Sequence, residues 1–327
     1  MTNRTSRFPL QWWLRVFVSV VVLGIVFAML PTEEIWITLQ LISLRVWTTC
    51  LGLYVTVHMI AALKWRFLIR HATKMSPAIA IRAHFAGLVA NLCLPGMAGG
   101  DVVRAGIAIR GASDSAGVVI GSLADRLIDM FALLVVGLLG VQLTAGSTVD
   151  AADVLAKFAV ALVTIPVAVM VGVSVASRVR LPVKMQRLVG KIAGAVAGIL
   201  RHPWRPLAAF GLALCVQSTL IALNVYLAER SGLELPRSAW FFAWPVAKLV
   251  AMIPISVAGL GVREATLAAI LAPMGANAVK VVAVGLVWQT ILIAGGLVGG
   301  ISLLLFRRPT SSGTGAVVAR SGPPTST

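Results

Sequence analysis

Charged residues are scarce in this 327-residue chain, and acidic residues are the scarcest of them. Asp, Glu, Lys and Arg together make up 12% of the sequence, about half the share found in an ordinary soluble domain. Hydrophobic residues make up 59%, and the mean hydropathy is +0.95. Because apolar runs of membrane-spanning length recur along most of the chain, we expect a single membrane domain over residues 12–306. This leaves no room for a soluble catalytic domain.

Residues that carry catalytic or metal chemistry are also rare. The three cysteines, Cys50, Cys93 and Cys215, lie in apolar stretches and are odd in number, which indicates small core residues and not disulfides or metal ligands. His58 and His84 have no neighbouring ligands at metal spacing, and this favours core or interface roles. The sequence also contains no recognisable pair of nucleophile and base. We therefore expect no cofactor, no metal and no enzymatic activity.

Basic residues outnumber acidic ones, 28 against 11, and the formal net charge is +17. In a soluble protein this excess would suggest a nucleic-acid partner. Here the bases lie in short segments between apolar runs, which is typical of cytoplasmic loops, so an anionic lipid surface is the expected partner and nucleic acid is not. We expect a multi-pass protein of the cell (inner) membrane with both termini cytoplasmic: tail 1–11 and a disordered tail 307–327.

The apolar segments occur in the order span, span, broken segment, span, and this order is found twice: 16–30, 41–63, 83–111 and a run ending at Val141, then 154–176, 206–228, 239–276 and 281–306. The basic stretches 64–82 and 177–205 can both be cytoplasmic only if segment 83–111 enters and leaves on that side. By the same parity, segment 239–276 enters and leaves from outside. The expected outside loops are 31–40, 142–153 and 229–238.

The expected fold is therefore an all-α integral membrane protein with an inverted-topology repeat. It would contain about six full transmembrane helices and two re-entrant helical hairpins, which makes about eight hydrophobic segments. Repeat 1 would cover 12–141 and repeat 2 would cover 154–306. The basic stretch 183–200 is further predicted to form an amphipathic helix on the inner leaflet. Gly295 and Gly299 have the spacing of a close helix contact.

Glycine and proline interrupt both broken segments, and these breaks are the first candidate site. At each tip, the second half-helix would present free N–H groups and the positive end of its dipole to an anionic headgroup. Arg104 lies one turn past Asp101, where it could add a charged fork to a phosphate. Alternatively, the glycines only permit close packing and the arginines extend to an interface. The candidate residues at the two breaks are Asn91, Pro95, Gly99, Gly100, Asp101 and Arg104, then Pro254, Ser256, Gly259, Gly261, Arg263 and Glu264.

A second candidate site is a group of charges in an apolar segment. The uncharged stretch after Asp129 is too short to cross a bilayer, so Asp125, Arg126 and Asp129 must lie in or near the hydrocarbon. Asp125 and Asp129 share a helix face, and Arg126 can reach Asp129. The group is either a substrate or protonation site or a structural ion pair. Lys248 could contact a phosphate, neutralise Glu264 or Asp125, or extend to the outer interface.

These motifs resemble the flippase-like transmembrane domain of lysylphosphatidylglycerol synthases, which has stand-alone relatives in bacteria and archaea. The matching residues are Asn91-Leu-Cys-Leu-Pro95-Gly96, Gly100-Asp101-Val-Val-Arg104, Ala124-Asp125-Arg126-Leu127-Ile128-Asp129, Pro254-Ile-Ser256 and Gly259-Leu-Gly261-Val-Arg263-Glu264. They occur in the family's order within residues 12–306. This chain has shorter acids where the family often has Glu, at Asp101 and Asp125, which changes the reach of each contact. No aminoacyl-transferase domain is present in these residues, so lysyl transfer is not expected.

The resemblance implies a flippase that moves an anionic, aminoacylated, polyprenyl-linked or glycosylated lipid between leaflets. In this hypothesis Arg104, Arg263 and Arg126 hold the phosphate, while carboxylates orient those arginines or contact a cationic headgroup. One alternative is a small-solute transporter coupled to protons through Asp125 or Glu264. Another is a non-transporting partner of a glycosyltransferase or lipid-modifying enzyme. The partners are then membrane lipids, a lipid substrate, such an enzyme, or a second copy of the chain.

Overall fold

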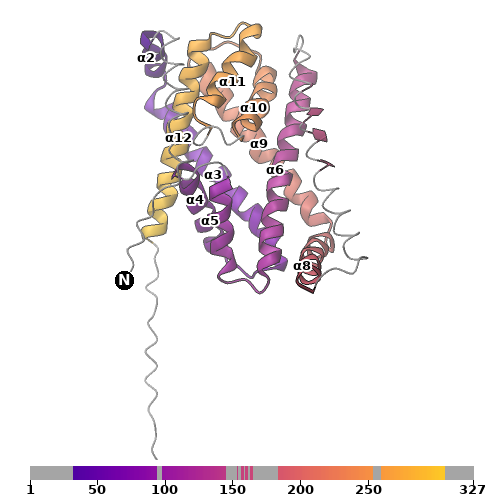
Figure 1. Cartoon of the computed structure of the whole chain (residues 1–327). Helices are drawn as coiled ribbons and strands as arrows, with labels where there is room; N and C mark the ends of the chain where they lie inside the picture. Colours follow the sequence, from indigo (N-terminus) through magenta and orange to yellow (C-terminus); the bar gives the residue numbers. More distant parts are fainter. Residues whose placement is uncertain are drawn as a thin grey trace, which may run out of the picture.

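The computed structural model describes residues 32–93, 98–144, 183–252 and 259–305, with scattered positions between 153 and 164. Throughout these residues the regular secondary structure is helical, without a strand (Figure 1). In chain order the elements are α2 (Thr32–Gln40), α3 (Leu44–Leu68), η1 (Ile69–His71), α4 (Pro77–Cys93), α5 (Ala98–Ile109), α6 (Ser115–Leu143), α8 (Val183–Leu200), α9 (Trp204–Arg230), α10 (Arg237–Ala251), α11 (Val262–Leu271), η3 (Ala272–Met274) and α12 (Ala278–Leu305).

Four helical segments are long and apolar enough to cross a bilayer: Leu44–His71, Ser115–Leu143, Trp204–Arg230 and Ala278–Gly300. They confirm four of the predicted spans, whereas the spans predicted at 16–30 and over most of 154–176 lie outside the described residues. Large apolar side chains such as Leu123, Phe131 and Leu297 are exposed on the outer faces of these helices, as a lipid environment requires. The chain is a multi-pass integral membrane protein.

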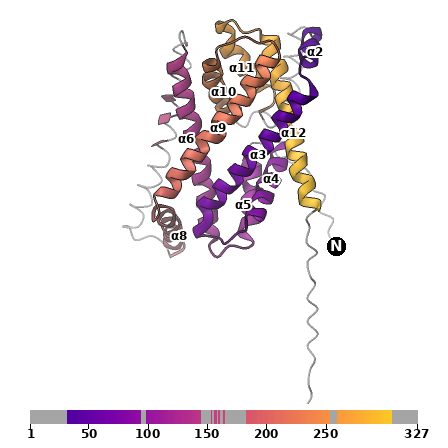
Figure 2. The same ribbon diagram turned by 180° about the vertical axis from the view of Figure 1, so that it is seen from behind.

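Two pairs of shorter helices lie between the long ones. Helices α4 and α5 pack on each other, as do α10 and α11. In both side views the α4–α5 pair occupies the lower half of the molecule and the α10–α11 pair the upper half (Figures 1 and 2). Helix α4 begins at Pro77, earlier than predicted, because proline suits the first turn of a helix, where its missing N–H is not needed. The breaks themselves, 94–97 and 253–258, lie outside the described residues.

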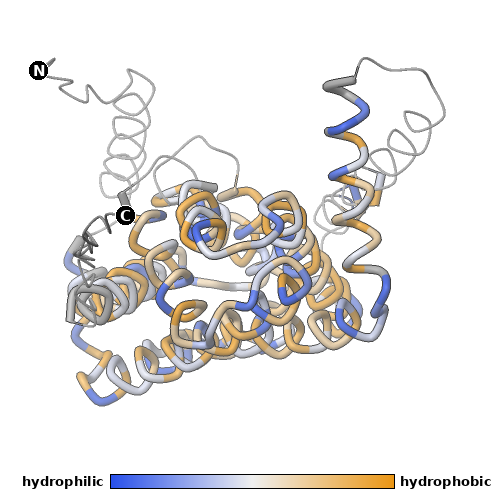
Figure 3. The backbone as a smooth tube through the Cα atoms, turned by 90° about the horizontal axis from the view of Figure 1, so that it is seen from below, coloured by the Kyte–Doolittle hydropathy of each residue, from blue (hydrophilic) through white to orange (hydrophobic). Residues whose placement is uncertain are grey.

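The basic helix predicted at 183–200 is present as α8, with the same bounds. Arg187 and Lys191 are exposed, whereas Ala195 is buried, so the helix has a polar and an apolar side. Helix α8 packs against the lower part of α6 and lies at the lower end of the molecule (Figures 1 and 2). In the view from below, the helix lies along the lower surface of the molecule. Hydrophobic residues predominate along most other helices (Figure 3).

Residues 31–40 were expected to form a loop, and that expectation is wrong for Thr32–Gln40, which form α2. The reason is a tertiary contact. Leu39 packs against Val279 and Ala283 of α12, and this buried apolar contact stabilises a helix too short to persist alone.

The largest apolar core joins α3, α9, α10 and α12. Trp240, Leu227 and Val281 are almost fully buried in it. Glycines on α12 let neighbouring helices approach closely, which confirms the predicted contact face. A Cβ at Gly295 would lie 2.5 Å from a ring carbon of Tyr54, and a Cβ at Gly299 would overlap the Phe85 ring. This packing holds α3, α4 and α12 around the polar interior described next.

Candidate functional site

A buried ion network begins where α3 faces α6. The ammonium of Lys64 lies 3.0 Å from Oδ1 of Asp125 and also pairs with Asp129, one helical turn further on. The side chains of Lys64 and Asp125 are 0% and 2% exposed, so neither charge is solvated by bulk solvent. Because Asp125 and Asp129 are four residues apart, both project from the same face of α6. The predicted shared face is therefore confirmed.

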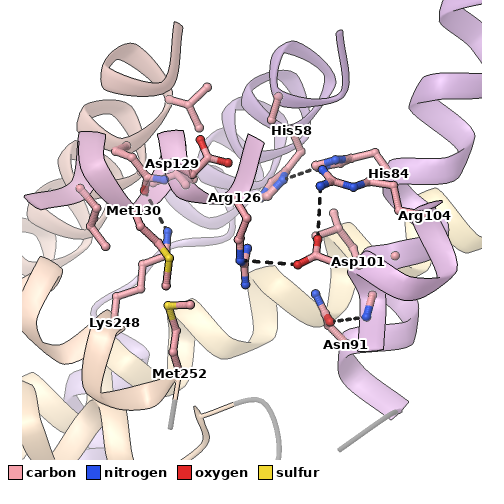
Figure 4. Close-up of a pocket in the computed structure, with 18 residues that line it drawn as sticks. His58, His84, Asn91, Asp101, Arg104, Arg126, Asp129, Met130, Lys248 and Met252 are labelled. Carbon is pink, nitrogen blue, oxygen red and sulfur yellow. Dashed lines mark hydrogen bonds and ion pairs between the residues drawn. The ribbon is translucent and has the colours of Figure 1, made fainter. Parts of the chain in front are cut away.

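The network continues through α5 as a row of alternating charges. Arg104 lies 3.1 Å from Oδ2 of Asp125 and 3.3 Å from Oδ1 of Asp101. Arg126 approaches Oδ2 of Asp101 at 3.5 Å and ends the row (Figure 4). Arg104 also lies 4.6 Å from the centre of the Trp65 ring, a cation–π distance. Alternation matters because a buried charge is tolerated only when an opposite charge compensates for its desolvation.

A smaller ion pair is found at the start of α11. Gly261, whose φ of 78° suits glycine, donates its N–H to Oε2 of Glu264 at 2.9 Å. Arg263 donates to Oε1 of the same carboxylate through Nε at 3.1 Å and through a terminal nitrogen at 2.5 Å. It also donates to Gln289 at 3.2 Å. Arg263 and Glu264 are both nearly fully buried, and together they form a neutral pair.

Lys248 differs from the other interior cations. Its ammonium donates to Oε1 of Gln217 at 2.8 Å, and within the described residues no carboxylate lies within 4.0 Å of it. Asp129 is close enough to act on Lys248 electrostatically, but its ion pair is with Lys64. Lys248 is therefore a cation inside the protein with only a neutral partner.

Two adjoining cavities lie among these groups. Cavity 1, of about 120 Å³, is lined from α3, α4, α5, α6, α9 and α10, and cavity 2, of about 170 Å³, from α3, α4, α6, α9, α10, α11 and α12. Each volume is large enough for several water molecules or a small polar group. Their shared wall consists of His58, Leu88, Asn91, Arg126, Leu220 and Lys248. In Figure 4, Arg126 projects into the pocket between Asp101 on one side and Lys248 on the other.

A histidine pair lies at the edge of cavity 1. Nδ1 of His58 lies 3.0 Å from Nε2 of His84, which joins α3 to α4 (Figure 4). His84 is 9% exposed, and its Nδ1 has no hydrogen-bond partner among the described residues. Both rings line cavity 1, and His58 also lines cavity 2.

The family model for the lysylphosphatidylglycerol synthase TM region matches residues 12–300, which is most of the sequence. The chain belongs to this family. The resemblance that the motifs suggested is thus confirmed. Searches of curated proteins and of solved structures found no match.

In this member of the lysylphosphatidylglycerol synthase TM family, eight of the sixteen predicted site residues line one of the two cavities. Those that line a cavity are Asn91, Gly100, Asp101, Arg104, Arg126, Asp129, Lys248 and Arg263. Asp125 and Glu264 line neither cavity and instead hold the arginines. Gly99, Gly259 and Gly261 do not line a cavity, although the φ angles of Gly259 and Gly261 (75° and 78°) shape the backbone before α11. Pro95, Pro254 and Ser256 lie outside the described residues.

Three sequence-based expectations need correction. Arg126 is not paired with Asp129. The guanidinium of Arg126 instead approaches Asp101 of α5, and Asp129 forms its ion pair with Lys64. Lys248 neutralises neither of the carboxylates proposed for it. The N–H groups at the starts of α5 and α11 are also not all free. Gly100 donates to Oδ1 of Asn91 at 2.8 Å, and Gly261 is bonded to Glu264.

Sequence reasoning missed four residues of the site. Lys64 was placed with the cytoplasmic bases of 64–82, but it is 1% exposed and holds two carboxylates within the bundle, so that assignment is wrong for Lys64. His58, His84 and Gln217 were taken as ordinary residues of apolar segments. The available signal was their polarity, since an isolated polar side chain in a membrane span usually faces the bundle interior.

Proposed function

We propose that this protein carries lipids between the two leaflets of the membrane, with the headgroup passing through cavities 1 and 2. The shared wall of the cavities is the observation that carries the proposal. It contains two cations, Arg126 and Lys248, inside a protein whose family is associated with lipid-related membrane function. Cavities 1 and 2 together form a polar chamber between otherwise apolar helices. Such a chamber suits a headgroup, while the acyl chains remain in the surrounding lipid.

The arrangement of the short helices supports an alternating-access mechanism. The α4–α5 pair lies in the lower half and the α10–α11 pair in the upper half, as expected of re-entrant hairpins that enter from opposite membrane faces (Figure 1). Residues of both pairs line cavity 2, including Asn91 from α4 and Arg263 from α11. In this proposal, repeats 12–141 and 154–306 rock against each other around the chamber. The lower end, which contains the basic helix α8, faces the cytoplasm in this proposal.

The same geometry disfavours the proton-coupled alternative. Asp125 and Glu264, the carboxylates proposed to carry protons, line neither cavity and are held in ion pairs with Arg104 and Arg263. Protons would need a wetted path to reach them. We therefore propose a lipid carrier that catalyses no covalent chemistry. A glycosyltransferase or lipid-modifying enzyme is a proposed partner that would supply or consume the lipid.

Blocking the shared wall tests the proposal without changing any charge. Leu88 lines both cavities, so Leu88→Trp should obstruct the passage of any headgroup. The matched control is Leu123→Trp, because Leu123 is 56% exposed on the outside of α6 and lines neither cavity. The assay is reconstitution into vesicles containing acyl-labelled fluorescent lipid, with dithionite quenching of the outer leaflet.

We expect wild type and the Leu123→Trp control to expose inner-leaflet lipid to quenching, and Leu88→Trp to return the rate to that of protein-free vesicles. Wild-type vesicles that match protein-free vesicles for every lipid tested would refute the proposed function. Full activity in Leu88→Trp would show that headgroups do not use the cavities.

A further inference from the structure

We infer that the chamber selects an anionic headgroup without an amino group over an aminoacylated, cationic one, with the phosphate held by Arg126 and Lys248. This inference rests on the proposed function and specifies the lipid class. It concerns a different property from transport itself, because a site can prefer one headgroup charge whether or not the lipid then crosses.

The charges around the chamber do not balance. The basic side chains of the two ion networks and of the cavity walls are Lys64, Arg104, Arg126, Lys248 and Arg263, and the acidic ones are Asp101, Asp125, Asp129 and Glu264. Each of these carboxylates lies within 4.0 Å of at least one of the cations. The excess is therefore one positive charge, and every carboxylate in the set already has a cationic partner. A single anionic group would neutralise the chamber.

The arginine with the longest ion pair is also the most accessible of the three arginines. The side chain of Arg126 is 33% exposed, whereas that of Arg104 and that of Arg263 are each 7% exposed. Arg126 approaches its carboxylate only to 3.5 Å, the long limit of hydrogen bonding, so its N–H groups remain available to a ligand. Arg126 and Lys248 both line both cavities and project toward the same space in Figure 4. Together they can hold a phosphate through charge-assisted hydrogen bonds.

The hydrogen-bonding groups of the neutral side chains around the chamber also favour an anionic ligand. The N–H of Gly100 and the ammonium of Lys248 are donors only, so the atoms they contact on Asn91 and Gln217 must be the amide oxygens. The NH₂ groups of Asn91 and Gln217 are then left as donors. Trp244, which lines cavity 2, adds an indole N–H without an acceptor among the described residues. These three donors favour a ligand that carries acceptor oxygens, such as a phosphate.

Binding in detergent separates this inference from transport. The probes are short-chain phosphatidylglycerol, short-chain lysylphosphatidylglycerol and glycerol 3-phosphate, and the readout is the fluorescence of tryptophans such as Trp244 and Trp288 in the wall of cavity 2. We expect the anionic lipid to bind about tenfold more tightly than the lysylated lipid. Both lipids carry the phosphate, but the excess positive charge of the chamber repels the ammonium groups of the lysyl headgroup. Glycerol 3-phosphate, which lacks acyl chains, should bind weakly. Equal binding of it would assign the site to a soluble phosphate ester and overturn the lipid assignment.

Variants of Lys248 give the sharpest test. Lys248→Gln should weaken binding of the anionic lipid about tenfold or more. It should weaken binding of the lysylated lipid less, because loss of the phosphate contact is offset there by relief of the repulsion between Lys248 and the lysyl ammonium groups. Lys248→Glu reverses the excess charge and should reverse the preference. The matched control is Lys280→Gln, at a lysine that donates to the Gly232 carbonyl and lines neither cavity. Arg126 is tested in the same way with Arg126→Gln. If that variant does not fold, Arg126→Lys replaces it because it keeps the charge. Elution volume and circular dichroism report whether each variant is folded.

A wild-type protein that binds the lysylated lipid as tightly as the anionic lipid, or more tightly, would overturn the inference and leave lipid transport intact. Unchanged affinities in both Lys248 variants would overturn the role of that residue as the phosphate ligand. Selective binding of the anionic lipid without transbilayer movement would instead refute the proposed function and support the headgroup class.

Discussion

Replacing Lys64 with methionine tests whether the buried charges are compensated as the structure indicates. Methionine keeps an unbranched apolar side chain but removes the ammonium that pairs with Asp125 and Asp129. At 3.0 Å and an effective dielectric constant of about 20, the attraction between Lys64 and Asp125 alone is about 5 kcal/mol before desolvation is counted. Removing one partner of a buried pair typically costs about 3–5 kcal/mol.

Two features place this variant at the lower end of that range. Asp125 keeps Arg104 as a partner at 3.1 Å, and the side chain of Asp129 is 22% exposed, so water or a ligand in cavity 1 can solvate it in part. We therefore expect Lys64→Met to lower the free energy of unfolding by about 3 kcal/mol. The measurement is reversible unfolding in mixed micelles by titration with dodecyl sulfate, followed by tryptophan fluorescence.

A double-mutant cycle attributes the loss to the ion pair. Asp129→Asn removes the charge that Lys64→Met leaves without its partner, so the double variant should recover to within about 1 kcal/mol of wild type. Lys280→Met, at a half-buried lysine that donates to the Gly232 carbonyl, serves as the control and should change little. If Lys64→Met unfolds like wild type, or if the two substitutions are simply additive, the compensated charge row is wrong.

Three other experiments probe packing, the second ion pair and topology. A Cβ at Gly140 would lie 2.5 Å from the backbone of α10, so Gly140→Ala should lower the thermal midpoint, whereas Gly52→Ala, with nothing within 4 Å, should leave it unchanged or raise it. Glu264→Gln strands a buried arginine and should cost about 3 kcal/mol by the same micelle titration. In a background without native cysteines, Arg110→Cys and Glu234→Cys should react with an impermeant maleimide from opposite sides. Labelling from one side would refute the topology.

Much of the fold could be predicted from local features of the sequence. The hydropathy of the chain located the four spans now seen in α3, α6, α9 and α12, because a span needs only length and apolar composition. The bounds of α8 followed from the same kind of reasoning. Helix α2 could not be predicted in this way, since it depends on a contact between Leu39 and residues about 240 positions further along, in α12.

The pairing of charges depended on features outside local sequence. Lys64 lies 65 residues from Asp129, and Lys248 lies 31 residues from Gln217. Sequence spacing favoured Arg126 as the partner of Asp129, because residues three positions apart on one helix are neighbours on its surface. The structure pairs Arg126 with Asp101, which only the packing of α5 against α6 brings close.

The amino-acid sequence by itself determined the membrane class, the family and the charged residues of the bundle other than Lys64, since each of these follows from composition, periodicity or short motifs. The tertiary structure alone decided which of those charges neutralise one another and that Lys248 has no acidic partner among the described residues. The physical reason is distance: the energy of an ion pair depends on the separation of the charges and on their burial, and helix packing sets both.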